Sequence, residues 1–327
     1  MVGCLLHLNE LPLRHLIRER DGETISGNKL AGPIGQQLDG QFYQNMLVEF
    51  LPVRTQLPRP PADVVRDLSA DQRILLEYML GISSGVIEER FVYSRPGPLS
   101  HARWLTTATR ILILYTRTPQ PSNVLRLLVK FIQSVYGPSW FKIKREKSFV
   151  KAPKLIHEMV LATKEIVDDD KSALQVLKNV LQRSAFCCLP ENFLAALLFS
   201  EEKAHREVAV TKILEIRSEP VKPPVSSVIP GLNFDAEDWG DLIDISAAQY
   251  ESPCTRNISD KDLKEMVLVN KAPPLIPIHT QSVERAVKMT SEACVLSSCW
   301  EKRHEYIVAK KESRNQRKSF DSKKDYI

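Results

Sequence analysis

The chain has 327 residues, of which 43% are hydrophobic and 26% charged, and its formal net charge at pH 7 is +5. This composition is that of a soluble globular protein, and its mild positive charge permits a nucleic-acid partner without requiring one. No apolar run reaches the roughly 18 residues of a membrane-spanning helix, so we expect no membrane partner. Six cysteines in so long a chain argue against a disulfide framework and favour an intracellular protein, nuclear or cytoplasmic.

The first part of the chain, residues 1–62, begins with an apolar stretch and a helical pattern. Residues 2–8 are apolar enough for either a strand end or the start of a helix. Residues 11–20 are predicted to form a helix with Pro12 in its first turn, where an amide hydrogen is not needed.

A region rich in glycine follows over residues 21–40 and leads to a proline-rich stretch. Its glycines lack the spacing of a phosphate-binding loop, so a surface loop is expected rather than a ligand cradle. The alternation of Met46, Val48 and Phe50 then favours a short strand over residues 42–50.

From residue 63 to residue 218 the pattern is almost wholly helical. Ser69 begins a capping box with Gln72, ahead of an apolar face over residues 74–87. Short connections between the helical segments favour antiparallel neighbours in a bundle. We therefore predict a mainly α protein with a multi-helical central domain. The other segments with helical periodicity are 99–118, 121–136 (with Pro121 at its first position and Gly137-Pro138 at its end), 152–167, 171–183, 190–199 and 202–217.

The C-terminal part divides into a linker and a last helical region. Residues 219–258 form a proline-rich linker followed by an acidic segment with interleaved aromatic residues. Residues 259–327 begin with a helix that Ser259 caps, and they end in a strongly charged tail. Between these lies an amphipathic helix over residues 279–293, in which Glu284 either pairs with a lysine on a solvated face or has a chemical role.

Aromatic and basic side chains alternate over residues 140–154, WFKIKREKSFVKAPK. Such a mixture suits phosphate contacts combined with base stacking. It fits equally well a solvated charged loop flanked by core aromatics. The candidate nucleic-acid-binding residues are Trp140, Lys142, Lys144, Arg145 and Lys147.

Two short motifs remain. Cys4 and His7 form a C-x2-H pair, which is half a zinc site, and neither Cys187-Cys188 nor the Cys294/Cys299 pair has ligand spacing to a histidine. We therefore predict no metal site there, and a buried cysteine beside a hydrogen-bonded histidine is favoured. Arg103 and Trp104 stand at the entry to the helical block, where a tryptophan is more often a core anchor than a ligand platform.

Three of these motifs, and their order along the chain, resemble those of hAT-like transposases. They are a C-x2-H pair, an Arg-Trp pair before a long helical region, and a late helix that contains Glu-Arg. That family has an RNase H-like core interrupted by an all-helical insertion. The resemblance implies that Glu284 matches the last catalytic acid and that Cys4 and His7 follow the second catalytic aspartate. Trp104 would match the tryptophan of the insertion.

A second resemblance spans nearly the whole chain. The chain is similar to a set of animal proteins that share short strings along their length. In this sequence those strings are LLHLNELPLRHL (5–16), GPIG (32–35), WFKIK (140–144), HTQ.VER..K (279–288), ESR (312–314) and KKD (323–325).

The chemistry of hAT-like transposases needs two aspartates and a glutamate to hold two Mg²⁺ ions about 3.5–4 Å apart. Both aspartates should precede Cys4, where only three residues stand. We therefore expect a partial RNase H-like remnant with few short strands at the N-terminus, no bound cofactor, and no cutting or joining of DNA. The chain is either a shortened transposon-derived protein or one whose N-terminal part is missing from this sequence.

Three functions follow from this reading. The first is a transposon-derived protein that retains DNA or protein binding. The second is a helical interaction protein with no nucleic-acid role, whose partners include a second copy of the chain. The third is an enzyme whose catalytic aspartates lie upstream of the sequence given.

Overall fold

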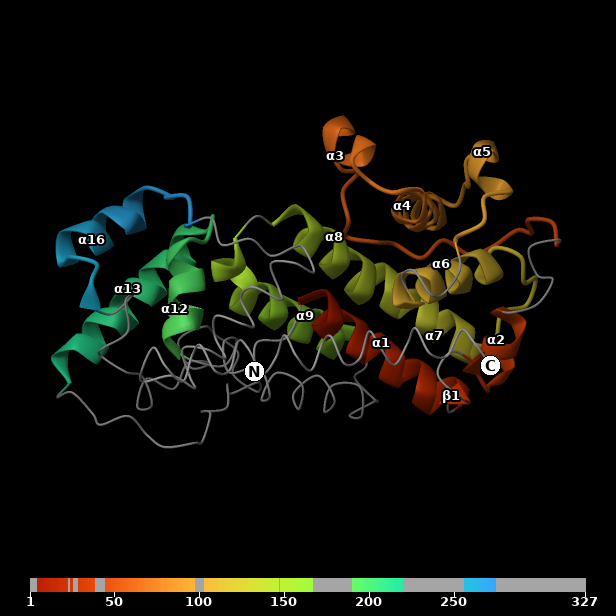
Figure 1. Ribbon diagram of the computed structural model, residues 1–327, viewed down its shortest axis with the longest axis horizontal. Coiled ribbons are helices and arrows are strands. Elements are labelled where there is room, and N and C mark those ends of the chain that lie inside the picture. Colours follow the sequence, from red (N-terminus) through yellow and green to blue (C-terminus); the bar gives the residue numbers. More distant parts are fainter. Residues whose placement is uncertain are drawn as a thin grey trace, which may run out of the picture. The chain divides into compact units, whose positions relative to one another are not determined.

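The computed structural model describes residues 5–22, 24–25, 29–38, 45–97, 103–146, 148–166, 190–219 and 256–274 (Figure 1). The chain divides into two compact units, Met1–Ile276 and Pro277–Ile327, and every described residue belongs to the first. The described residues are mainly helical, as predicted. In that part of the chain, no helix combines the length and the apolar character needed to cross a membrane.

Nine helices of nine or more residues lie within the described ranges. They are α1 (Leu5–Asp21), α4 (Ala70–Ser84), α6 (Arg103–Tyr115), α7 (Asn123–Phe131), α8 (Gly137–Arg145), α9 (Ala152–Ile166), α12 (Pro190–Leu198), α13 (Lys203–Ser218) and α16 (Asp260–Leu268). The short elements are β1 (Thr24–Ile25), β2 (Lys29–Leu30), α2 (Pro33–Leu38), α3 (Ala62–Arg66), α5 (Glu89–Val92), the π-helix η2 (Ile132–Tyr136) and the 3₁₀ helix η3 (Phe149–Lys151).

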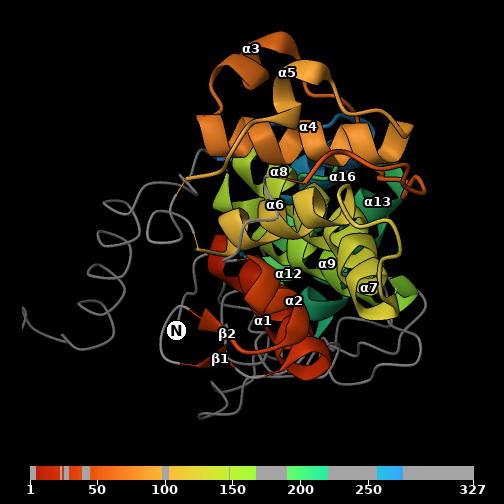
Figure 2. The ribbon, with the colours of Figure 1, turned by 90° about the vertical axis from the view of Figure 1, so that its right-hand side faces the viewer.

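One apolar core joins the N-terminal helix to the helical block. Helix α1 packs against α7, α8 and α9, and α4 packs against α6. Figure 2 shows α4 lying across α6, with α3 and α5 on its outer side. The boundary predicted between residues 62 and 63 therefore falls inside a single packed unit. Fully buried members of this core include Leu13, Ile17, Leu75, Tyr78, Ile111, Leu128, Phe131 and Val160.

Helix α1 begins earlier than predicted. It starts at Leu5 rather than at residue 11, so Pro12 lies inside the helix and not in its first turn. The reason is that Leu5, Leu8 and Leu16 are all buried, and one apolar face runs the length of the helix. Packing along that face offsets the cost of about 3 kcal/mol that an internal proline carries.

The strand predicted over residues 42–50 is absent from residues 45–50, which have no regular secondary structure. The backbone N–H of Val48 donates to Thr116 O at 3.1 Å. The hydroxyl of Tyr115 donates to Leu51 O at 2.8 Å. Backbone and side-chain groups at the end of α6 thus bind this segment in place of a neighbouring strand.

The helix predicted over residues 121–136 begins and ends differently. It starts at Asn123 rather than at Pro121, and the side chain of Ser122, the residue before it, accepts from Leu125 N. The helical backbone also does not end at Gly137-Pro138. It continues from α7 through the π-helix η2 directly into α8.

Side chains from elsewhere make this continuation possible. Pro138 has no N–H to donate to the preceding turn, and the Gln133 carbonyl instead accepts from the Thr55 hydroxyl at 2.6 Å. The Asn9 side-chain amide donates to Tyr136 O at 3.0 Å. A proline therefore ends a helix in sequence-based reasoning but not here, where a tertiary contact satisfies the carbonyl that Pro138 leaves free.

The glycine-rich region is partly a packed joint rather than a surface loop. The carboxylate of Asp21, at the end of α1, accepts from Ile34 N at 2.8 Å and Gly35 N at 2.7 Å. It thereby satisfies two free N–H groups in the first turn of α2. A Cβ atom on Gly32 would lie 1.3 Å from Asp21 O, so only glycine fits at this position.

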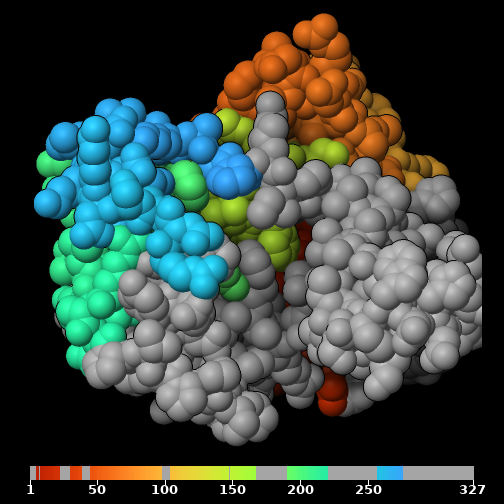
Figure 3. Space-filling model, turned by 60° about the vertical axis from the view of Figure 1, so that its left-hand side comes forward, coloured from red at the N-terminus to blue at the C-terminus, as the bar shows by residue number. Residues whose placement is uncertain are grey.

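The last described segment, residues 256–274, lies on α13, as Figure 3 shows for α16 in blue over α13 in green. Ser259 caps α16 as predicted, because its side chain accepts from Asp262 N. Only Leu263 and Met266 of this segment are buried apolar side chains. The Arg217 guanidinium holds the start of the segment by binding the Asp260 carboxylate.

Candidate functional site

Four of the five predicted basic and aromatic residues fall on helix α8, and their side chains separate onto two faces. Trp140 is 4% exposed, and its ring meets Phe141 edge-on with centroids 5.0 Å apart. Lys142, Lys144 and Arg145 are exposed in the last turn. These cations can reach a phosphate, whereas the buried Trp140 ring presents no face for a base to stack on. Lys147 lies outside the described residues.

The exposed cations differ in whether a carboxylate already neutralises them. Lys142 Nζ lies 3.0 Å from Glu158 Oε2, on the neighbouring helix α9. No ion pair of Lys144 or Arg145 occurs among the described residues. The last turn of α8 therefore presents two cations without a carboxylate partner there and one that is paired. Three basic residues at a helix C-terminus also stabilise α8 itself, through the helix dipole.

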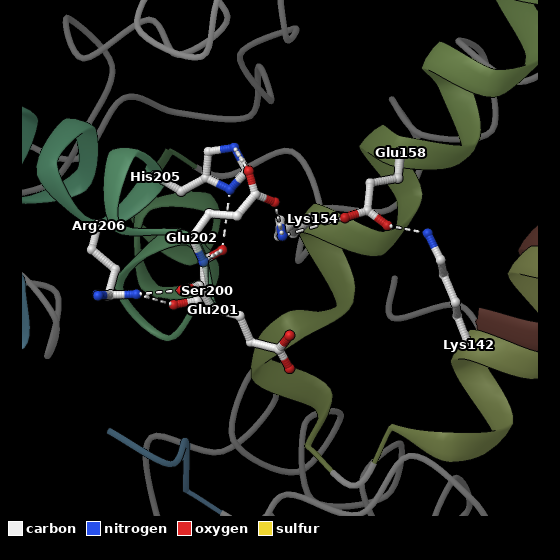
Figure 4. A network of polar contacts seen from close by, with 8 residues as sticks. All are labelled: Lys142, Lys154, Glu158, Ser200, Glu201, Glu202, His205 and Arg206. Atoms are coloured by element: carbon white, nitrogen blue, oxygen red, sulfur yellow. Dashed lines mark hydrogen bonds and ion pairs between the residues drawn. The ribbon is translucent and has the colours of Figure 1, made fainter. Parts of the chain in front are cut away.

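A chain of alternating charges continues from Lys142 across three helices (Figure 4). Glu158 also approaches Lys154, with Oε1 and Nζ 3.4 Å apart. Lys154 in turn lies 3.5 Å from Glu202 Oε1, just before α13. Glu202 Oε2 is 3.2 Å from His205 Nε2. This chain links α8, α9 and α13 by charge as well as by packing.

The end of this series of ion pairs, at the start of α13, contains a serine, a histidine and a glutamate in contact. Ser200 Oγ and His205 Nδ1 are 3.1 Å apart, which is the distance of a nucleophile and its base. Ser200 is only 2% exposed, however, and its Oγ accepts from Glu202 N. These contacts are those of a serine that fixes the turn before α13 and not those of an accessible nucleophile. Burial, and next the charge of Lys154, lower the pKa of His205.

The remaining predicted residues are only partly covered by the structure. Cys4 and Glu284 lie outside the described residues, as does the predicted helix over 171–183. His7 lies in α1 and Arg103 is the first residue of α6, but the structure does not describe their side chains. Trp104 is buried in the core, which agrees with a core anchor. No group of three metal-ligating side chains occurs among the residues that were placed.

Sequence reasoning missed a set of arginines that bind the carbonyl ends of helices. Arg110 donates to Leu38 O, the last residue of α2, at 3.2 Å. Arg117, seven residues further along the chain and just past the end of α6, donates to Val92 O at the end of α5. The seven-residue spacing of Arg110 and Arg117 was a visible signal, because in a continuous helix it would place both on one stripe. Their partners could not be read from it.

A buried histidine makes the stability depend on pH. His157 of α9 packs edge-on against Phe193, with ring centroids 5.8 Å apart. Burial first, and then the charge of Lys164, lowers the pKa of His157 from 6.5 to about 4, although Glu158 opposes this. At pH values between about 4 and 6.5, the unfolded chain binds more protons at His157 than the folded chain does. The free energy of unfolding should therefore fall as the pH drops through this window, by about 2 kcal/mol at pH 5.

Urea unfolding at pH 7 and pH 5 measures this effect. His157→Gln removes the titrating group, so the loss of stability between the two pH values should shrink by that amount. His15→Gln, which removes a half-buried histidine of α1, should leave most of the loss in place. Equal losses in the wild type and in His157→Gln would show that His157 is not the responsible group.

Comparison of the chain with protein-family models, curated proteins and solved structures finds no match in any of the three. The described geometry is that of a helical scaffold with an exposed basic helix end and an ion-pair chain beside it. The function must therefore be inferred from the chemistry of these side chains.

Proposed function

We propose that this chain is a helical nucleic-acid-binding module that contacts the phosphate backbone through the last turn of α8. The observation that supports this most is the position of Lys142, Lys144 and Arg145 on a turn whose other face is buried. Trp140 and Ile143 anchor that face in the core. An anchored helix holds its cations in place, so little conformational freedom is lost when a polyanion binds.

The proposal includes a relation to hAT-like transposases, which rests on the sequence motifs. The helical block from residue 63 to residue 218 would then correspond to the all-helical insertion, and residues 1–62 to a remnant of the RNase H-like core. The module would bind DNA in the nucleus without cutting or joining it.

Changing both Lys144 and Arg145 to alanine should weaken binding to duplex DNA by roughly tenfold or more near 0.1 M salt. Binding releases fewer counterions for each phosphate contact that is lost, so the slope of log K against log salt should become shallower by about 0.9 per contact. The loss should be the same for unrelated DNA sequences, because phosphates carry no sequence information. Fluorescence anisotropy with two labelled duplexes at several salt concentrations measures all three quantities.

The matched control changes Lys261 and Lys264 to alanine. Both are exposed on α16, and neither forms an ion pair with another described residue. This variant loses the same net charge at a different place, so its affinity should stay close to that of the wild type. Equal losses in the two variants, or wild-type binding no tighter than that of an unrelated protein of equal charge, would reject the proposal.

A second candidate function is protein–protein interaction without nucleic acid. Leu51 is 66% exposed and Val86 is 70% exposed. Their neighbours Pro52 and Gly85 are close together, since a Cβ on Gly85 would lie 3.3 Å from Pro52 Cγ. Neighbouring exposed apolar side chains favour a contact with another protein chain, a second copy included. A stable dimer in light scattering, together with no response to DNA, would favour this function over the first.

A further inference from the structure

We infer that Glu158 competes with phosphate for Lys142 and so limits the affinity of the basic turn of α8. This inference rests on the proposed function and adds a regulatory element to it. It starts from the observation that one of the three cations of the turn already binds a carboxylate of the same chain.

The geometry places Glu158 between two lysines (Figure 4). Its side chain is 29% exposed, and its two oxygens lie 3.0 Å from Lys142 Nζ and 3.4 Å from Lys154 Nζ. Lys142 is 56% exposed and stands at the edge of the ion-pair chain. Lys154 is 15% exposed and is held by Glu202 as well. A ligand can therefore reach Lys142 from solvent, whereas Lys154 stays within the chain of ion pairs.

The chemistry of the pair makes competition the expected behaviour. A carboxylate and a phosphate present the same kind of anionic oxygen to an ammonium group. An ammonium group has no fixed fork geometry, so its lysine can exchange one anion for another without a change of helix position. A phosphate that binds Lys142 must then displace Glu158 or share the ammonium with its negative charge. Displacement and sharing both reduce the binding free energy that the phosphate gains from its contact with Lys142.

Glu158→Gln removes this competition while keeping the side-chain volume. Affinity for a labelled DNA duplex should rise about three- to eightfold near 0.1 M salt, and the slope of log K against log salt should steepen by about 0.9. The gain should disappear when Lys142→Ala is added, because Lys142 is the cation that is released.

The matched control is Glu165→Gln on the same helix. Glu165 is exposed and forms no ion pair with another described residue, so this variant makes the same change in net charge without releasing a lysine. A general effect of net charge would raise the affinity of both variants equally. That result would overturn the inference while leaving the proposed function intact.

A second comparison does not depend on Glu158→Gln being well folded. If Glu158 occupies Lys142 in the wild type, Lys142→Ala should cost clearly less affinity than Lys144→Ala. Equal costs for the two variants would overturn the inference. If neither the wild type nor Glu158→Gln binds DNA more tightly than a protein of equal charge, the proposed function fails, and the inference fails with it.

Discussion

Replacement of Arg206 by methionine is expected to detach residues 256–274 from α13 and to lower the free energy of unfolding by about 3 kcal/mol. Arg206 is 4% exposed, and every hydrogen-bond acceptor found for it is a backbone carbonyl. Its Nη1 donates to Ser200 O and Glu201 O, each at 2.8 Å. Its Nη2 and Nε donate to Val267 O at 3.0 and 3.3 Å. One side chain thus joins the turn before α13 to the last turn of α16.

The loss should be large because methionine fills the space but leaves one buried and two partly buried carbonyls without this donor. Helix α16 buries only two apolar side chains, and Arg217 binds only its first turn, so Arg206 provides the polar contacts at its other end. Arg206→Lys should lose most of the same stability, since an ammonium group cannot reach carbonyls on both sides as the planar guanidinium does.

Hydrogen exchange by mass spectrometry measures the detachment directly. Amides in α16 should exchange much faster in Arg206→Met than in the wild type, while those in α6 should change little. Lys203→Met, on an exposed position of the same helix, should change stability by less than about 0.5 kcal/mol. Unchanged protection of α16 in Arg206→Met would show that its two buried side chains and the Arg217 contact suffice to hold the segment.

Gly32→Ala is expected to lower the free energy of unfolding by more than about 3 kcal/mol, or to prevent α1 from packing against α2. The added Cβ would lie 1.3 Å from Asp21 O and 2.2 Å from Asp21 C. Both are backbone atoms, so no rotation of a side chain relieves the overlap. The joint can accept the methyl group only by moving Asp21, which breaks its two hydrogen bonds to the first turn of α2.

Urea unfolding followed by circular dichroism measures the effect, and Gln37→Ala provides the control. Gln37 is exposed on α2, and its amide donates only to Pro33 O, within the same helix. Its replacement should change stability by less than about 0.5 kcal/mol. If residues 29–38 were a surface loop, as the glycine spacing suggested, Gly32→Ala would leave the unfolding midpoint unchanged.

Much of the helical architecture could be predicted because its signals are local. Ser69 and Gln72 form their capping box within four residues, and Ser259 caps α16 in the same way. The apolar faces that define α9, α12 and α13 also repeat within a few turns. Residues close in sequence decide these features, so the sequence contains the information needed.

The candidate site was predictable only in part. The sequence located Lys142, Lys144 and Arg145 as a basic cluster, and the structure places all three in an exposed turn. The sequence could not tell that Trp140 is buried, because its burial depends on which neighbours α8 packs against. It also could not tell that Lys142 is neutralised, because Glu158 is sixteen residues away on another helix.

By itself, then, the sequence determined the helical character of the protein, most helix positions and the location of its basic cluster. The tertiary structure decided which carbonyls Arg206 satisfies, how the chain continues through Pro138, and why glycine is required at position 32. The physical reason is the same in each case. Caps and apolar periodicity act between residues a few positions apart, whereas buried hydrogen bonds, ion pairs and steric limits depend on partners that only the packed chain brings together.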